Sequence, residues 1–396
     1  MTGINGETFN GLGKPAALEA TRSILTPITQ FSLIPSHKAV LREIHRAGSA
    51  TRIDLTKTTG LSTQSLTRIT KELIDDGLIV EGERRITGRG QPAIYLSIRP
   101  SCMVSFGLVI EHDQITCVAS ELGGEQLVYL KRHGDFQKAD AALAEAGAML
   151  ATAIDQAPPK ALALGVGVSV SGFFVEEGSR RFVSRNDIEG WRAIDLTHDL
   201  PLPIPMPVFV ENDGRAAAIG QAVDGIGRGL ESFFLVLMTK GIGGGFVYRG
   251  ELIRGSLGNA GDLTGFVPRS PSTKRPTAES LTNFLRQKWS APPTDAQIDA
   301  ALRDGDPAIL DWLDGAGQSL EQALAVVAGL LDPKAVILAG RLSPAVRQAL
   351  ADRIKVETVN FAGFQAPSPM ILVDPKTDCL SVGATALPVA AYLYSR

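Results

Sequence analysis

The chain has 396 residues, a net charge of −3 and 44% hydrophobic residues, so it is long enough for two or three domains, each with its own core. Its three cysteines, Cys102, Cys117 and Cys379, are far apart and indicate neither a disulfide framework nor a zinc site. No segment has the pattern of a signal peptide or of a membrane-spanning helix, so we expect a cytoplasmic protein.

The charge is unevenly distributed along the chain. Residues 1–35 are rich in Gly, Thr, Ser and Pro and predict a flexible leader. Residues 36–99 then contain 11 Lys and Arg against 7 Asp and Glu, an excess of four positive charges, so the remainder is acidic. A basic module attached to an acidic body is typical of a nucleic-acid-binding arm on a soluble domain.

Three short helices are predicted in the basic module. The first begins at Ser36 and stops at Gly48, and Thr51 opens the second with a capping box. Ser62 caps the third, which ends at Gly77. Helices this short, with a tight turn before the third, predict a helix-turn-helix. Two strands at 78–80 and 93–98 enclose a basic, glycine-rich tip and complete a winged helix over 36–99.

Polar side chains on the third helix are the candidate DNA-binding residues. They can reach base edges and phosphates when the helix lies in a major groove. Arg89, between two glycines of the wing, can enter a minor groove. The alternative is a winged helix that makes only protein contacts. The residues predicted on the third helix are Thr63, Gln64, Ser65, Thr67, Arg68 and Lys71.

After Pro100 the pattern changes to an α/β body. Strands at 104–110, 115–119 and 127–130 are followed by a helix at 139–156 and a buried strand at 161–168. We expect Gly107 to open a turn that carries Glu111, His112 and Asp113. Hairpins followed by a helix and a strand suggest the ribonuclease H-like half of a two-lobed, actin-like fold.

The stretch around residues 207–266 carries most of the candidate chemistry. Asn212 and Asp213 directly follow a short apolar strand at 208–210, and a helix begins near Arg215. Ligands bind at this position in open α/β sheets, so Asp213 is a candidate hydroxyl acceptor or general base. Asn212 can both donate and accept, which suits the paired hydroxyls of a sugar. Equally, the pair can simply cap the helix.

Three loops near this stretch have two interpretations each. Gly241–Gly245 can let a phosphate approach the backbone, or it can serve only tight packing. A second glycine-rich loop at 255–262 delivers Asp262, as a ligand group or as a turn cap. The turn at 185–191 can present Asn186 to a ligand, or it can be a surface loop anchored by Trp191.

The remaining chain predicts a second α/β lobe. Glu279 opens a helix, residues 295–327 are mostly helical, and 335–339 is a buried strand. A small-residue helix at 381–394, interrupted by Pro388, is expected to pack back on the first lobe.

Together these pieces resemble the ROK family (repressor, open reading frame, kinase), in its transcriptional-regulator branch. The resemblance covers almost everything after residue 36, and the order and spacing of its motifs are specific. It is carried by the wing at 88–93, Asn186 and Trp191, Glu211-Asn212-Asp213, Gly241–Gly245, Arg254-Gly255, Ala260-Gly261-Asp262, Glu279 and 337–340.

The resemblance implies a two-lobed, actin-like (ASKHA) sugar-kinase-type domain over 100–396. Lobe one is expected at about 100–220 plus 376–396, and lobe two at about 221–375. It also implies a sugar pocket between the lobes, with the residue matching Asp213 acting as catalytic base in kinase members. The implied sugar-binding residues are Asn186, Asn212, Asp213, Asp262 and Glu279.

The chain departs from the kinase pattern at three places. Kinase members have Asp-x-Gly-Gly-Thr in the first hairpin for the ATP phosphates, whereas residues 107–113 lack the adjacent glycines and the threonine. The family's zinc site needs a histidine and cysteines, but the histidine position is Gly265 and residues 270–277 contain neither. Asp262 replaces the usual glutamate with a side chain one methylene shorter, which leaves the identity of the sugar open.

We therefore interpret the chain as a sugar-responsive regulator, a repressor without a cofactor, metal or catalytic activity. Its expected partners are operator DNA and a sugar or sugar-phosphate effector, and the expected assembly is a homodimer or homotetramer. A phosphoryl-transfer site without a phosphate cradle has little activity, because the reaction depends on positioning and charge neutralisation. The rivals are a sugar kinase that also carries a winged helix, and a sugar sensor that acts only through protein partners.

Overall fold

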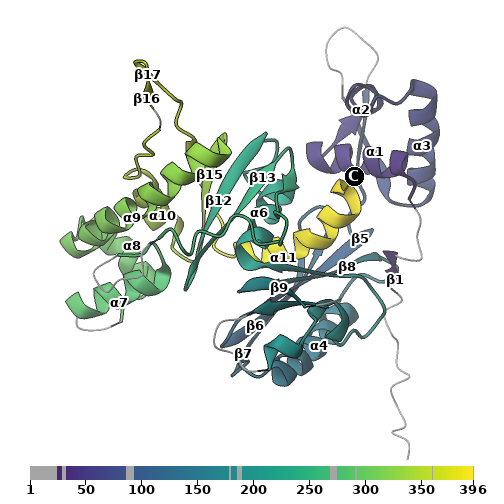
Figure 1. Cartoon of the computed structure of the whole chain (residues 1–396). Coiled ribbons are helices and arrows are strands. Elements are labelled where there is room, and N and C mark those ends of the chain that lie inside the picture. The colour runs from purple at the N-terminus through teal and green to yellow at the C-terminus, as the bar shows by residue number, and fades with distance from the viewer. Residues whose placement is uncertain are drawn as a thin grey trace, which may run out of the picture.

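The computed structural model describes residues 25–28, 33–85, 93–177, 180–184, 190–267, 274–289, 292–358 and 360–395. It has a small winged helix at one side of a larger two-lobed body (Figure 1). In that view the winged helix lies at the upper right, lobe one below it and lobe two at the left. Helix α11 (Cys379–Val389) runs between the lobes and ends beneath the winged helix.

The winged helix has the predicted order of elements, with an additional short strand. It consists of α1 (Pro35–Ala47), β2 (Ala50–Thr51), α2 (Arg52–Thr59), α3 (Thr63–Asp75), β3 (Ile79–Arg85) and β4 (Ala93–Ile98). The capping box of Thr51 and the cap of Ser62 are both present, which explains why α2 and α3 begin where they do. β4 lies between β2 and β3 in an antiparallel sheet. Residues 86–92, including Arg89, lie outside the described residues.

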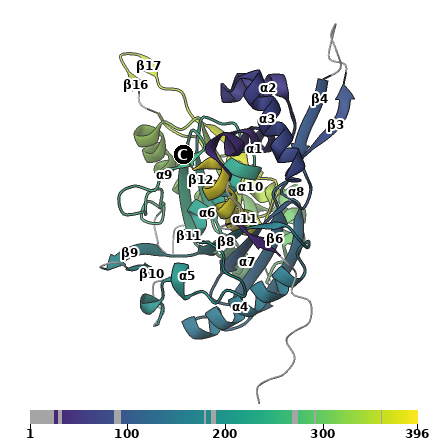
Figure 2. The same ribbon diagram turned by 90° about the vertical axis from the view of Figure 1, so that its right-hand side faces the viewer.

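Lobe one is built on a six-stranded mixed sheet. Its elements are β5 (Met103–Ile110), β6 (Gln114–Glu121), β7 (Gln126–His133), α4 (Ala139–Asp155), β8 (Leu162–Val170), β9 (Phe173–Glu177), β10 (Arg180–Ser184), α5 (Leu196–Asp199), β11 (Val208–Asn212) and α6 (Asp213–Asp224). β5, β6 and β7 form an antiparallel meander, whereas β8 pairs in parallel with both β5 and β11. β9 and β10 form a separate ribbon that projects from the body in Figure 2.

Lobe two repeats the same arrangement of strands. Its elements are β12 (Ser232–Met238), β13 (Ile242–Tyr248), β14 (Glu251–Leu252), α7 (Ala278–Lys288), α8 (Asp295–Arg303), α9 (Pro307–Leu331), β15 (Ala335–Gly340), α10 (Pro344–Ala351), β16 (Asn360–Phe361), β17 (Phe364–Gln365) and β18 (Met370–Val373). β14, β13 and β12 are antiparallel, and β12, β15 and β18 are parallel. Two meander-plus-parallel sheets in one chain are the two lobes that the sequence predicted.

Helix α11 joins the lobes through close backbone packing. It contacts α6, β5 and β8 of lobe one and β15 of lobe two, and a π-helical turn, η3 (Ala390–Tyr394), follows it. A Cβ at Gly167 of β8 would lie 1.9 Å from the Ala384 oxygen, and one at Gly107 would lie 2.9 Å from Thr385. Gly107 therefore lies within strand β5 to admit this helix, and the prediction that it opens a turn is wrong. The turn begins at Glu111.

A second difference concerns the leader. Thr26–Pro27 forms a short strand, β1, parallel to the start of β8, and Leu25, Ile28 and Leu33 are buried. These residues are part of the folded body, because apolar side chains beside an open strand edge can bury surface there. The interpretation of the whole of 1–35 as a flexible leader is thus wrong at 25–28 and 33–35. Among the described residues, none of the helices is both long and apolar enough to span a membrane.

Candidate functional site

Asp213 is the first residue of α6 and lies where β11 ends. Its Oδ2 accepts a hydrogen bond from Ser171 Oγ at 2.7 Å, and its Oδ1 accepts one from the Gly214 amide at 2.8 Å. Burial raises the pKa of Asp213 above its usual value, while the bonds from Ser171 and Gly214 act in the opposite direction. The carboxylate is thus oriented from both oxygens and can accept a ligand hydroxyl.

The side chain of Asn212 forms hydrogen bonds with two neighbouring backbone groups. Its Oδ1 accepts from the Gly214 amide at 2.9 Å, which makes it the N-cap of α6. Its amide nitrogen donates to the Gly172 carbonyl at 3.0 Å and ties the loop after β8 to the loop after β11. The capping interpretation therefore accounts for Asn212 without a ligand, although a partly exposed amide retains hydrogen-bonding capacity.

The glycines of β13 let the start of α6 approach the strand closely. A Cβ at Gly214 would lie 2.6 Å from the Gly244 amide nitrogen, and one at Gly244 would lie 2.7 Å from the Gly261 oxygen. Gly244 and its neighbours thus serve tight packing, the second of the two interpretations for this stretch. Gly241 and Gly243 are exceptions, because nothing lies within 4 Å of a Cβ at Gly241, and a Cβ at Gly243 would meet only Asp213 and Gly214, each at 3.8 Å.

The turn between β12 and β13 holds Asp262 and Glu279 in place. Asp262 caps its own loop by accepting from the Thr264 amide at 2.7 Å, and Thr264 Oγ1 donates to the Ile242 carbonyl at 2.9 Å. The α7 helix that carries Glu279 is attached to the same turn, since the Ala278 amide donates to Thr239 at 3.1 Å. Glu279 is exposed in the first turn of α7. Asn186 lies outside the described residues.

An ion triad lies at the junction of β11 and α6, and two of its three side chains are buried. Glu211 accepts from Arg215 Nε at 2.7 Å and from Arg254 Nε at 3.0 Å. The side chains of Glu211 and Arg215 are each only 2% exposed, so removal of Glu211 would leave Arg215 as an unpaired buried charge, which typically costs about 3–5 kcal/mol. The sequence gives no local signal for this triad, because Glu211 lies in β11 and Arg215 in α6, so the four-residue rule for pairs on one helix does not apply to them.

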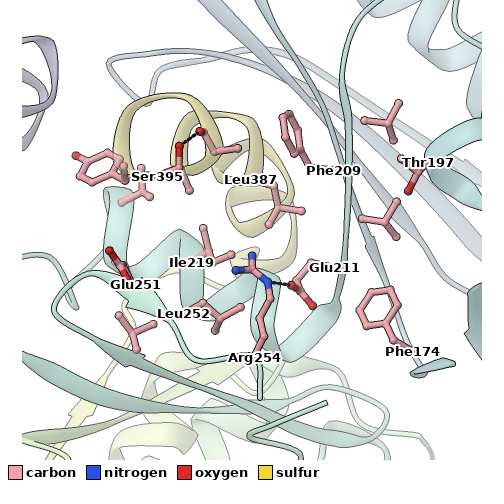
Figure 3. A pocket seen from close by; sticks show the side chains of 18 of the residues that line it. Phe174, Thr197, Phe209, Glu211, Ile219, Glu251, Leu252, Arg254, Leu387 and Ser395 are labelled. Carbon is pink, nitrogen blue, oxygen red and sulfur yellow. Dashed lines mark hydrogen bonds and ion pairs between the residues drawn. The ribbon is translucent and has the colours of Figure 1, made fainter. Parts of the chain in front are cut away.

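Arg254 and Glu211 also line a pocket of about 570 Å³ (Figure 3). Its walls are mostly apolar and include Phe209, Ile219 and Leu387. Figure 3 shows the ion pair of Arg254 and Glu211 in the same pocket. Asp213 is not among the residues that line it. The pocket is therefore separate from the candidate sugar site at Asp213.

The first hairpin faces lobe two through two ion pairs. Lys240 Nζ bonds both carboxylate oxygens of Asp113 at 2.8 Å, and Arg341 pairs with Glu111. The hydrogen bond from Lys240 lowers the pKa of Asp113. Glu111 also accepts from Gln114. The turn between β5 and β6 therefore presents two carboxylates to the β12–β13 and β15–α10 connections.

The candidate DNA-binding residues lie on one face of α3. Thr63, Gln64, Thr67, Arg68 and Lys71 are exposed, whereas Leu66, Ile69 and Leu73 on the opposite face are buried. Ser65 is half-buried and is used by the helix cap, because its hydroxyl and amide both bond Ser62.

Arg68 donates to Glu72 at 2.8 Å, and its side chain remains 59% exposed. An ion pair this open is weak, with a typical value of 0–1 kcal/mol, so a phosphate can replace Glu72 as the partner of Arg68.

His45, at the end of α1, attaches the winged helix to the body. Its Nδ1 bonds the Tyr394 hydroxyl and its Nε2 bonds the Leu122 carbonyl, both at 2.8 Å. Its Nε2 also lies 3.5 Å from Asp224, the last residue of α6. Helix α6 thus begins at Asp213 in the candidate sugar site and ends at the residue that faces the winged helix. No local sequence pattern indicates this junction.

Among the residues that the structure describes, no group of three or more His, Cys, Asp and Glu side chains is arranged to hold a metal ion. The three cysteines are free, and burial raises the pKa of each thiol to about 12.

Comparisons with known proteins divide the chain at the same place as the structure. Residues 106–276 match the ROK family, and residues 31–89 match the MarR family. The N-acetylglucosamine repressor of Escherichia coli O157:H7 is 23% identical over 90% of this chain and 92% of its own length. The xylose repressor of Bacillus subtilis is 24% identical over 58% of this chain and 59% of its own length.

Solved structures show the fold as a whole and the body by itself. The chain is similar, with a TM-score of 0.64 and 23% identity, to a ROK family transcriptional regulator described as a homologue of the E. coli MLC protein. That likeness covers 90% of this chain and 96% of the other. A ROK family glucokinase from Streptomyces griseus has a TM-score of 0.56 and 21% identity, over 72% of this chain and 98% of its own. Both regulators and kinases therefore share this body.

Proposed function

The chain belongs to the ROK family and carries a MarR-type winged helix, and from this premise we propose that it is a sugar-responsive transcriptional regulator, a repressor that binds operator DNA. The observation that carries the proposal is the junction at His45. It couples a helix-turn-helix with an exposed polar face to the far end of α6, the helix that begins at the candidate sugar site. A regulator requires a connection through which ligand binding can alter the DNA-binding domain, whereas phosphorylation of a sugar does not require one.

The proposed DNA contacts are divided between phosphates and bases. Gln64, in the first turn of α3, has the side-chain amide that can read an adenine edge, and Arg68 and Lys71 can contact phosphates. Ser65 is proposed as a contact through its hydroxyl, and Thr63 and Thr67 flank it on the same face. Arg89 of the wing is proposed as a minor-groove contact.

The proposed effector is a sugar or a sugar derivative, bound beside Asp213. Asp213 supplies an oriented carboxylate, and Asp262 and Glu279 are attached to the turn on the facing lobe. Asn186 and Asn212 complete the proposed set. The names of the two repressors above, which refer to N-acetylglucosamine and xylose, support a carbohydrate as the class of ligand. Acidic and amide groups in this number match a hydroxyl-rich ligand.

We propose further that the body has lost phosphoryl transfer. The turn of the first hairpin, which holds the ATP phosphates in kinase members, here presents Glu111 and Asp113, and ionised carboxylates offer a phosphate no hydrogen-bond donor. Arg341 and Lys240 of lobe two pair with these carboxylates, so the chain's own ion pairs occupy the position that the phosphates take in kinase members. The alternative is a ROK sugar kinase, and the likeness to glucokinases favours it.

The proposed mechanism is a change in lobe closure on sugar binding that α6 transmits to the winged helix. Because α6 packs closely on α11 through Gly220 and Gly383, the two helices move as one unit. In a dimer, the two recognition helices must enter grooves at a fixed spacing, so a small change in orientation alters the affinity for DNA. A dimer or a tetramer is the proposed assembly.

DNA binding is the first test of the proposal. Lys71→Ala is expected to weaken operator binding similarly for all sequences and to reduce the slope of log K against log salt by about one per subunit. Gln64→Ala is expected to cost about 1–3 kcal/mol at one base position and to relax specificity there. Arg303→Gln, an exposed arginine of α8, removes a charge remote from the winged helix and serves as the control. Salt-independent or absent DNA binding by the wild type would refute the proposal.

A coupled ATP-consumption assay over a panel of sugars tests the alternative function. Turnover near the ordinary kinase range of about 1–100 per second with any sugar would establish the kinase. The regulator is expected to show none above background, while the same sugar raises the thermal midpoint of the protein.

A further inference from the structure

A second polar cavity lies between the winged helix and the body, at the other end of α6 from Asp213. Its volume is about 450 Å³. One wall comes from α1 and the other from the loop at 227–231 and the turn at 249–251, and Tyr394 closes one side. The residues of the candidate sugar site do not line it. The cavity is large enough for a phosphate or a small sugar phosphate.

Arginine side chains line both walls of this cavity. Arg42 and Arg46 come from α1, and Arg228 and Arg249 come from the body. Three glutamates are also present. Glu43 lies 2.7 Å from Arg46 and 3.7 Å from Arg42, and Glu231 lies 3.7 Å from Arg249. Glu251 is the third. Four positive charges against three negative ones leave the lining with a formal excess of one positive charge.

Arg228 supplies the unsatisfied hydrogen-bond donors of this lining, and the charge of Asp224, outside the lining, also acts on it. The Nε and Nη2 atoms of Arg228 are buried, and neither has a hydrogen-bond partner among the described residues. A buried guanidinium nitrogen without an acceptor is costly, and native proteins generally satisfy such groups with protein atoms, water or a ligand. A planar guanidinium fits two oxygens of one phosphate at once, which a lysine or a water molecule cannot reproduce.

We propose that this cavity is a binding site for a phosphate dianion, either inorganic phosphate or the phosphate group of a small phosphorylated metabolite. Arg228 anchors the ligand from the body, and Arg42 reaches it from α1. A ligand held from both walls joins the winged helix to the body, so its binding free energy favours the docked orientation of the two. The site is separate from the sugar cleft, and its existence depends neither on DNA binding nor on a sugar.

The test is calorimetric titration of the full-length protein with three probes at constant ionic strength: inorganic phosphate, a hexose 6-phosphate and the unphosphorylated hexose. Inorganic phosphate is expected to bind saturably to the wild type. Arg228→Gln is expected to weaken this binding at least about tenfold, because a charge-assisted pair is lost. Arg303→Gln is the charge-matched control and should bind like the wild type.

Further variants keep the result interpretable. Asp213→Asn should leave the affinity for inorganic phosphate unchanged, so a failure of the sugar-site proposal does not affect this one. If circular dichroism shows that Arg228→Gln is unfolded, Arg42→Gln on the opposite wall gives the second measurement, with a loss of several-fold expected. A hexose 6-phosphate that binds more tightly than phosphate and loses that affinity in Arg228→Gln identifies a sugar phosphate as the ligand. Equal affinity for the two identifies phosphate itself.

Two results would overturn the proposal. One is the absence of saturable phosphate binding by the wild type at any concentration where ionic strength can be matched. The other is an affinity in folded Arg228→Gln and Arg42→Gln equal to that of Arg303→Gln.

Discussion

The two ends of α6 lie beside sites lined by different kinds of side chain. At its N-terminal end Asp213 faces the β13 glycines, with the loop of Asp262 packed on the same strand. At its C-terminal end the cavity is lined by arginines of α1 and of the loop at 227–231. A single helix thus separates the proposed sugar site from the proposed phosphate site. If both sites bind as proposed, one chain responds to two classes of ligand, and each site discriminates against the ligand of the other.

The substitution with the largest expected effect should abolish both proposed sites. Gly167→Ala would place a methyl group 1.9 Å from the Ala384 carbonyl oxygen in α11, a backbone atom that cannot rotate away. Displacement of α11 also disturbs α6, which packs against it, so both sites should be lost together. We expect destabilisation of more than about 3 kcal/mol, measured by urea denaturation.

Gly329→Ala is the matched control for this substitution. Gly329 lies within α9, and nothing is found within 4 Å of a Cβ placed there. Alanine at this position should stabilise the helix by about 0.5–1 kcal/mol. Equal stability of the two variants would show that α11 does not hold the lobes in the way described.

A smaller and more selective effect is expected from Asp213→Asn. The substitution keeps the shape of the side chain but removes the charged acceptor, so sugar affinity should fall about tenfold or more. Because burial raises the pKa of Asp213, its ionised form is disfavoured in the native state, and the neutral amide should cost little stability. Calorimetry with the sugar that stabilises the wild type measures the first effect, and the thermal midpoint the second. Unchanged sugar affinity would show that the cleft residues are misassigned.

The local structure of the winged helix could be predicted from the sequence because its signals span only a few residues. Thr51 and Asp54 form a reciprocal capping box, and Ser62 bonds the amide three residues later, as the spacing indicated. The position of Asp213 after a buried strand was readable for the same reason. In each case the partner lies within four residues or at the end of the same strand.

Contacts between distant residues were not predictable in this way. His45 and Tyr394 are separated by 349 positions, and neither has a sequence context that distinguishes it from an ordinary polar residue. Glycine is frequent in turns, which favours a turn at Gly107 from the sequence alone. In the structure, a glycine is needed at this position because Thr385 of α11 approaches the strand closely. The pairing of Thr26 with β8 likewise depends on an open strand edge that appears only when the sheet is assembled.

The smallest expected effect concerns pH and the junction end of α6. Burial lowers the pKa of His45 below its ordinary value of 6.5, although the charge of Asp224 opposes this shift. Because the native state holds His45 neutral, the unfolded chain binds a proton that the folded chain does not. The stability that His45 contributes is therefore complete above pH 6.5 and declines as the pH falls from there towards its lower native pKa.

Replacement of His45 by glutamine should remove this slope, which is at most about 1.4 kcal/mol per pH unit for one proton. Thermal midpoints of the wild type and of His45→Gln, measured from pH 7.5 to pH 5.5, give the comparison. Burial raises the pKa of Asp224, so its protonation at lower pH favours the native state and reduces the slope in both proteins. His198, which is exposed on α5, provides the control, since His198→Gln should keep the wild-type slope. Parallel curves for His45→Gln and the wild type would show that the junction does not hold His45 neutral.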